Sequence, residues 1–200
     1  MKRTIKIFVL IALSMLMVSC TQELPLNKDL TKKSYELVNQ DSMRVVFPEV
    51  IKGNITVMGF IYTHCPDICP MTTHNMYLTE MKLKKEEIED IKFVALSFDP
   101  ERDKPDVLKK FAEMREIDFK NWTLITGEPS VIYDLLRRFD VRAVATDSVF
   151  YENGDVSYSM MHTDRISLID KEGKLRKNYV GSKINIEELI KDIKYLGEYL

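Results

Sequence analysis

The sequence predicts an α/β protein with a central mixed sheet flanked by helices. Two short, nearly continuous apolar runs, residues 55–62 and 91–98, are typical of strands buried on both faces of a sheet. Segments with helical periodicity alternate with such runs through the middle of the chain. Near the C-terminus the pattern changes to two adjacent strand-like runs followed by a helix. These observations together predict one α/β domain.

Composition agrees with a single globular domain. The chain has 200 residues, of which 45% are hydrophobic and 30% are charged. Its 29 basic and 31 acidic residues give a net charge of −2 and are spread along the whole length. Because no basic block could follow a phosphate backbone, the sequence argues against nucleic acid as a partner.

The N-terminus predicts export. Lys2, Arg3 and Lys6 precede an apolar run over residues 7–18, which is the layout of a secretory signal, here assigned to residues 1–19. The run is shorter than the roughly 20 apolar residues of a membrane-spanning helix. The rival interpretation, a permanent anchor helix, would require the polar residues after Cys20 to enter the membrane as well.

Cys20 ends a segment, Met17 to Cys20, that resembles the lipobox of bacterial lipoproteins, with Met17 in place of the usual leucine. The resemblance implies that Cys20 is lipidated and becomes the first mature residue, so that the protein is anchored to the outer face of a bacterial membrane. Each buried CH₂ of the acyl chains adds about 0.8 kcal/mol of membrane affinity. The alternative is that Cys20 is an incidental cysteine of the signal.

The first half of the domain predicts alternating strands and helices. Residues 20–34 are polar and predict a tether, followed by the domain over residues 35–200. Pro48 places residues 43–50 in an edge strand or hairpin, since proline cannot donate to a central ladder. The further predictions are strands over 55–62, 91–98 and 122–125, and helices from the segment 65–70 to about 89, over 104–116 and over 129–139.

The C-terminal part predicts a β-hairpin and a helix. Strand-like runs at 165–169 and 175–180 are separated by a turn containing Gly173, and a helical pattern covers 186–199. Strand–helix units followed by a hairpin and a helix give the element order of the thioredoxin fold carrying an insertion.

Cys65 and Cys69 are the remaining cysteines once Cys20 is set aside. A disulfide that closes so short a loop stabilises little, so in an exported protein the pair is better interpreted as redox-active or metal-binding. The pair lies where a buried strand leads into a helix, and a helix N-terminus lowers the pKa of a thiol, so at least one sulfur is expected to be partly thiolate. The i, i+4 spacing places both sulfurs on one side of a helical path.

His162 is the candidate third donor among the histidines His64, His74 and His162. It precedes the terminal hairpin, where the thioredoxin fold brings a loop against the helix that carries the cysteines. Oxidoreductases of this fold carry a cis-proline there, but this chain has no proline after Pro129. Two cysteines and one histidine suit copper or zinc, and soft thiolates select Cu(I). The alternative is an ordinary surface histidine.

Three acidic residues near these positions keep two interpretations each. Asp99 follows a predicted strand end, where α/β proteins gather ligand sites. The segment 99–103 is therefore interpreted either as part of a functional site or as a capping and turn segment ahead of the helix at Lys104. Asp103 also suits a cap ahead of a helix with Pro105 in its first position. Asp67 suits either tuning of the thiols or capping of the helix.

Four motifs resemble the Sco/SenC family over about residues 35–200. They are FIYTHCPDICP at 60–70, LSFDPERD at 96–103, WTLITG at 122–127, and His162 ahead of SLIDKEG at 167–173. The resemblance implies a thioredoxin-like domain outside a membrane that binds copper, as Cu(I) or Cu(II), through Cys65, Cys69 and His162. It also implies a partner, the copper-bearing subunit of cytochrome c oxidase.

Three functions compete for the same cysteines. The leading hypothesis is a copper metallochaperone, which is not an enzyme, supplied by an upstream copper donor. The second is a thiol-disulfide reductase that uses a redox-active Cys65–Cys69 disulfide to keep the oxidase cysteines reduced. The third, a thiol peroxidase, would need a peroxidatic cysteine in a pocket that activates peroxide.

Overall fold

The computed structural model describes residues 24–65, 68–150 and 156–199. Its main sheet has eight strands in the order β1-β10-β9-β4-β5-β6-β2-β3. At its centre β4 (Ile55–Ile61) runs parallel to β5 (Ile91–Ser97), which runs parallel to β6 (Trp122–Thr126). All seven residues of β4 are buried. The prediction of a mixed sheet with its apolar runs at the centre is confirmed.

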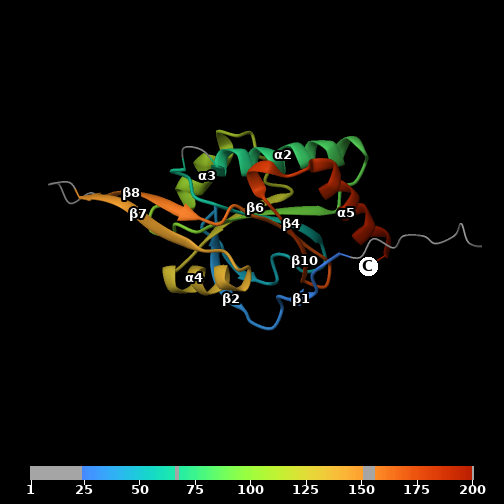
Figure 1. Ribbon diagram of the computed structural model, residues 1–200, viewed down its shortest axis with the longest axis horizontal. Helices are drawn as coiled ribbons and strands as arrows, with labels where there is room; N and C mark the ends of the chain where they lie inside the picture. Colours follow the sequence, from blue (N-terminus) through green and yellow to red (C-terminus); the bar gives the residue numbers. More distant parts are fainter. Residues whose placement is uncertain (1–23, 66–67, 151–155, 200) are drawn as a thin grey trace, which may run out of the picture.

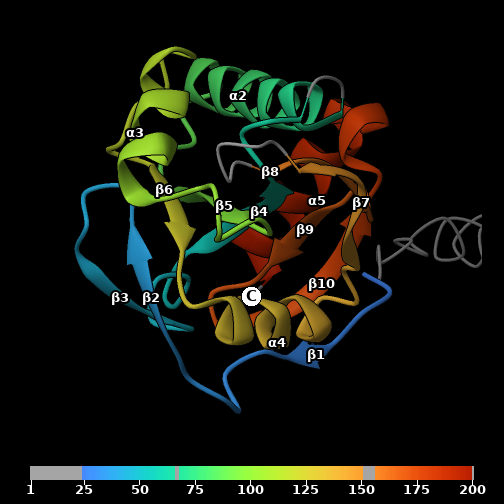
Figure 2. The same cartoon turned by 90° about the vertical axis from the view of Figure 1, so that its left-hand side faces the viewer.

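Helices cover both faces of this sheet. Helices α2 (Ile68–Lys85), α3 (Pro105–Glu113) and α5 (Ile186–Tyr199) lie on one face, and α4 (Pro129–Arg138) lies on the other (Figures 1 and 2). Helix α2 connects β4 to β5, and α3 connects β5 to the next parallel strand, β6. Because both connections are right-handed and advance in the same direction across the sheet, the two helices lie on the same face. The helices predicted from periodicity are confirmed.

The C-terminal hairpin is also confirmed. Strand β9 (Ile166–Ile169) pairs antiparallel with β10 (Lys174–Tyr179) and with β4. Gly173 closes the turn at a φ of 78°, a conformation that glycine adopts without a steric penalty. A short 3₁₀ helix, η2 (Gly181–Lys183), then leads into α5.

A second hairpin, which no sequence pattern predicted, lies between α4 and β9. Strands β7 (Ala143–Phe150) and β8 (Val156–His162) form a two-stranded sheet of their own. This hairpin extends away from the body of the domain, at the end where α2 begins (Figure 1). His162 is the last residue of this hairpin.

The folded part of the chain begins before residue 35. Strand β1 (Lys28–Asp29) pairs with the edge of β10, and the side chains of Leu24 and Leu30 are buried in the core. Residues 24–34, expected to be a tether, therefore pack against the domain. The next hairpin is β2 (Tyr35–Asn39) with β3 (Arg44–Phe47), and β3 is the edge strand predicted from Pro48.

The predicted signal peptide and Cys20 lie outside the described residues. Within the described part of the chain, none of the helices combines the length and the apolar character needed to cross a bilayer.

Candidate metal centre

Cys65, Cys69 and His162 come together at the end of the molecule from which the β7–β8 hairpin extends. One potential ligand atom from each residue lies within 4.8 Å of the other two. The Cys69 Sγ to His162 Nε2 distance is 3.9 Å, and no disulfide joins the two cysteines. Among the described residues this is the one group of three metal-binding side chains that converge in this way.

The two cysteines occupy different positions at the start of α2. Cys69 is the second residue of the helix and is fully buried, whereas Cys65 lies in the preceding turn and is half-buried. The amide N–H of Cys69 donates a hydrogen bond of 3.3 Å to Cys65 Sγ. One amide of the first turn of the helix therefore points at the sulfur of Cys65. Asp67 lies outside the described residues.

The expectation of a thiolate does not hold for Cys69. Its hydrogen bond with Cys65 and its burial raise the pKa of the Cys69 thiol far above its usual value. The hydrogen bond with Cys65 and burial together disfavour the charged form more strongly than the helix N-terminus favours it. Cys69 is therefore a neutral thiol in the copper-free protein at neutral pH.

His162 presents one ring nitrogen to the cysteines. Its Nδ1 lies 3.2 Å from the carbonyl oxygen of Thr163, an arrangement that assigns the N–H to Nδ1. The lone pair of Nε2 then faces Cys69. The imidazole packs against Phe98, at 4.6 Å between ring centroids, and edge-on against Tyr62 at 6.0 Å. Aromatic packing and a backbone hydrogen bond thus fix both the tautomer and the orientation of the ring.

Asp103 holds the turn ahead of Cys65 instead of capping α3. Its buried carboxylate accepts hydrogen bonds from the hydroxyls of Ser97 and Thr63, both at 2.6 Å, and from the Thr63 amide at 3.0 Å. The cap residue of α3 is Lys104, which makes no capping hydrogen bond, while Pro105 takes the predicted first position. Burial raises the pKa of Asp103 despite these hydrogen bonds. The capping interpretation of Asp103 is wrong because its side chain turns back toward β4.

Asp164 is a site-supporting residue that sequence reasoning missed. Its carboxylate accepts hydrogen bonds from the Ser182 hydroxyl at 2.6 Å, the Ser182 amide at 3.0 Å and the Thr72 hydroxyl at 3.1 Å. It therefore ties the segment after His162 to α2, the helix that carries Cys69. No local pattern marks this aspartate, because its partners are distant in the sequence.

His64 and His74 lie outside the converging group. The side chain of His64 is 55% exposed, and its Nδ1 contacts the hydroxyl of Thr63 at 3.1 Å. The ring of His74 stacks on Tyr77. Leaving both histidines out of the ligand set agrees with these positions.

A family model described as SCO1/SenC matches residues 24–198. The chain belongs to the SCO1/SenC family. This result confirms the resemblance carried by the four sequence motifs. The match also begins at Leu24, so it covers the N-terminal residues that pack against this SCO1/SenC domain.

Solved structures share the fold of this SCO1/SenC chain. A SCO1/SenC family lipoprotein from Bacillus anthracis str. Ames is 34% identical, with a TM-score of 0.71 over 86% of this chain and 97% of that chain. BsSco, described as a Sco family cytochrome c oxidase assembly protein with a disulfide switch, is 31% identical. Its TM-score is 0.70, over 90% of this chain and 100% of that chain. Arabidopsis thaliana ScoI with copper bound is 27% identical, with a TM-score of 0.70 over 84% of this chain and 98% of that chain.

Proposed function

We propose that this chain is a copper chaperone. In this proposal Cys65, Cys69 and His162 bind the copper, which passes to the copper-bearing subunit of cytochrome c oxidase during assembly of the oxidase. The observation that carries the proposal is the convergence of two sulfurs and one imidazole nitrogen within 4.8 Å. The copper-bound ScoI and the oxidase assembly role of BsSco support it.

The donor set suits a metal that is bound and then released. Thiolates select Cu(I), and an imidazole nitrogen makes the site acceptable to Cu(II) as well. Structural zinc sites are closed by four protein ligands, whereas three donors converge here among the described residues. A three-donor site leaves room for an incoming thiolate or imidazole of the partner. Copper is then transferred by exchange of one ligand at a time.

A second function, thiol-disulfide reduction, has its own support. The two cysteines are close together and not joined by a disulfide, and the related BsSco has a disulfide switch. In this reaction the Cys65 and Cys69 thiols are oxidised to a disulfide while a disulfide of the oxidase subunit is reduced to two thiols. The exchange is balanced in electrons and protons and needs no further reagent.

Replacement of His162 separates the two functions. We expect His162→Ala to bind Cu(II) more than about tenfold more weakly, which corresponds to a loss of at least 1.4 kcal/mol of binding free energy. Cu(I) binding should suffer less, because two thiolates suffice for Cu(I). The measurements are anaerobic copper titrations and transfer of copper to a copper-free oxidase domain.

The outcome for disulfide exchange decides between the functions. Transfer lost in His162→Ala, with disulfide exchange retained, supports the chaperone. Oxidase maturation that survives in His162→Ala but fails in Cys65→Ser and Cys69→Ser would favour the reductase. Wild-type Cu(II) affinity in His162→Ala would remove His162 from the ligand set.

We propose in addition that the protein is exported and held on the outer face of a bacterial membrane by lipid on Cys20. The charged-then-apolar N-terminus, the lipobox-like segment and the relative described as a lipoprotein support this proposal. A separate copper donor protein would load the site on that face.

A further inference from the structure

We propose that Asp99, Arg102 and Tyr158 form a clamp that positions His162 for metal binding. Asp99 and Arg102 belong to the loop after β5, and Tyr158 lies on β8 four residues before His162. The proposal deepens the proposed function, because it concerns the third donor of the same site. It assigns to the acidic loop a role that the sequence left open.

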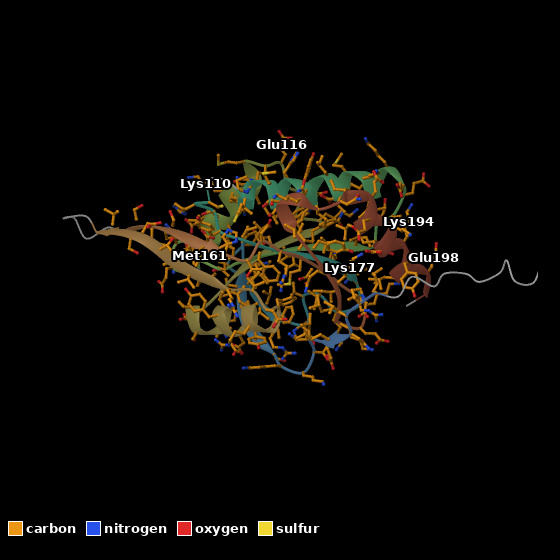
Figure 3. The ribbon with its side chains drawn as sticks, viewed as in Figure 1. Lys110, Glu116, Met161, Lys177, Lys194 and Glu198 are labelled. Atoms are coloured by element: carbon orange, nitrogen blue, oxygen red, sulfur yellow. The ribbon has the colours of Figure 1, made fainter. Side chains whose placement is uncertain are left out.

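The β7–β8 hairpin needs such a clamp because backbone pairing does not fix it to the domain. Within the described chain, its two strands are paired only with each other and are not part of the eight-stranded sheet. Alternation along β8 puts Tyr158 and His162 on one face and Ser159 and Met161 on the other. Met161 is 68% exposed and lies near the base of the hairpin (Figure 3). Side-chain contacts of the inner face must therefore determine where His162 lies.

The clamp consists of three hydrogen bonds and one stacking contact. Arg102 donates from Nε to Asp99 Oδ2 at 2.5 Å and from Nη1 to the carbonyl oxygen of Tyr158 at 2.9 Å. The Tyr158 hydroxyl donates to Asp99 Oδ1 at 2.6 Å. The Arg102 guanidinium also lies 3.5 Å from the centre of the Tyr158 ring. Both the backbone and the side chain of Tyr158 are thus held by a charged pair, and charge-assisted hydrogen bonds are the stronger kind.

The same loop contacts the imidazole directly. Phe98, the residue before Asp99, packs against the ring of His162, and the Arg102 guanidinium lies 5.6 Å from the centre of Tyr62, which also packs against that ring. Cys65 and Cys69 lie instead around the start of α2, away from β8. Loosening the clamp should therefore displace the imidazole and leave the dithiol in place.

Two substitutions test the clamp. Tyr158→Phe keeps the ring that stacks on Arg102 and removes the hydroxyl that binds Asp99. Arg102→Lys keeps the positive charge but cannot bind Asp99 and the Tyr158 carbonyl with one planar group. Ser159→Ala, on the exposed face of the same strand, is the matched control. Circular dichroism and thermal unfolding of each copper-free variant establish that the domain is folded.

We expect both clamp variants to bind Cu(II) about tenfold more weakly, since a hydrogen bond to a charged group contributes about 1.5 kcal/mol. Electron paramagnetic resonance of the Cu(II) forms should show weakened nitrogen coupling, while Cu(I) affinity, measured against a chromophoric chelator, stays near the wild-type value. Ser159→Ala should match the wild type throughout. Wild-type Cu(II) affinity and nitrogen coupling in both clamp variants would overturn the proposal.

Hydrogen exchange of the copper-free protein tests the clamp independently of the metal. Tyr158→Phe and Arg102→Lys should accelerate exchange of the β8 amides, with no change in β4 and β5. Unchanged exchange in β8 would overturn the clamp even where copper binding is normal. A wild-type protein that binds no copper would instead overturn the proposed function, and the exchange data would still decide the clamp.

Discussion

Cys69 links metal binding to proton release at this site. Metal binding requires a thiolate, but the copper-free protein holds Cys69 as a buried neutral thiol whose pKa is raised by its hydrogen bond with Cys65 and by burial. Because the pKa is raised, Cys69 keeps its proton throughout the neutral range. The metal must displace that proton when it binds.

We therefore expect the apparent Cu(I) affinity to rise with pH, by about tenfold per pH unit for each proton released. The measurement is a chelator competition series between pH 6 and 8, together with a direct count of released protons in weakly buffered solution. Cys69→Ser should release one proton fewer than the wild type. Equal proton release in the two proteins would show that Cys69 is already ionised.

The buried Asp103 makes the stability of the protein depend on pH. Its pKa is raised by burial, so the folded state holds the proton more tightly than the unfolded state. The contribution of Asp103 to stability is therefore present below its unfolded pKa of about 4 and is lost as pH rises through the raised folded pKa.

Asp103→Asn should remove this pH dependence and cost about 1–3 kcal/mol at low pH, because one amide oxygen cannot replace both carboxylate oxygens toward Ser97 and Thr63. The measurement is urea unfolding of both proteins between pH 4 and 8. The stability difference between wild type and variant should shrink as pH rises. A difference that grows with pH would mean that the carboxylate is stabilised as an anion.

At the scale of elements, strand β1 adds residues 24–34 to the domain, although the polar composition of this segment is typical of a linker. Two residues pair with β10, and the amide of Leu30 donates to the Gly173 carbonyl at 3.1 Å. The side chain of Leu30 is fully buried. The buried leucines, not the short backbone pairing, explain why this segment packs against the sheet.

We expect Leu30→Ala to lower the free energy of unfolding by about 2–5 kcal/mol, the usual cost of replacing a buried leucine by alanine. Lys32→Ala, at an exposed position of the same segment, is the control and should change stability by less than about 0.5 kcal/mol. Chemical denaturation gives both values. Equal stability of the two variants would mean that the buried Leu30 side chain does not stabilise the domain.

For the whole molecule, the packing of Leu24 limits the distance between the proposed lipid anchor and the domain. Four peptide steps separate Cys20 from Leu24, and a fully extended chain advances at most about 3.6 Å per residue, so the separation is at most about 14 Å. If Cys20 is lipidated, the domain lies close to the membrane, where an oxidase subunit is assembled.

Cys20→Ala should release the protein from the membrane or leave it unprocessed, while copper binding by the domain is unchanged because residue 20 precedes the packed chain. Membrane fractionation and mass spectrometry of the mature N-terminus measure both outcomes. Mature Cys20→Ala protein that still partitions with lipid would contradict the lipid anchor.

The sequence alone determined the features that arise from local pattern. Continuous apolar runs predicted the central strands because their residues are buried on both faces, and helical periodicity predicted α2 to α5. The cysteine spacing identified the dithiol, and the absence of proline after Pro129 drew attention to His162. Four motifs together indicated the family.

Tertiary structure decided the features that depend on residues far apart in the chain. Tyr158 meets Asp99 across 59 positions, and Asp164 meets Thr72 across 92, so no local period marks either pair. The hydrogen bond with Cys65 and burial together raised the pKa of Cys69, where a helix terminus by itself favours a thiolate. Packing against distant strands also placed Leu24 and Leu30, in a segment expected to be a tether, in the core. A sequence pattern shows how one segment can fold, whereas the positions of donors and charges depend on which segments pack against it.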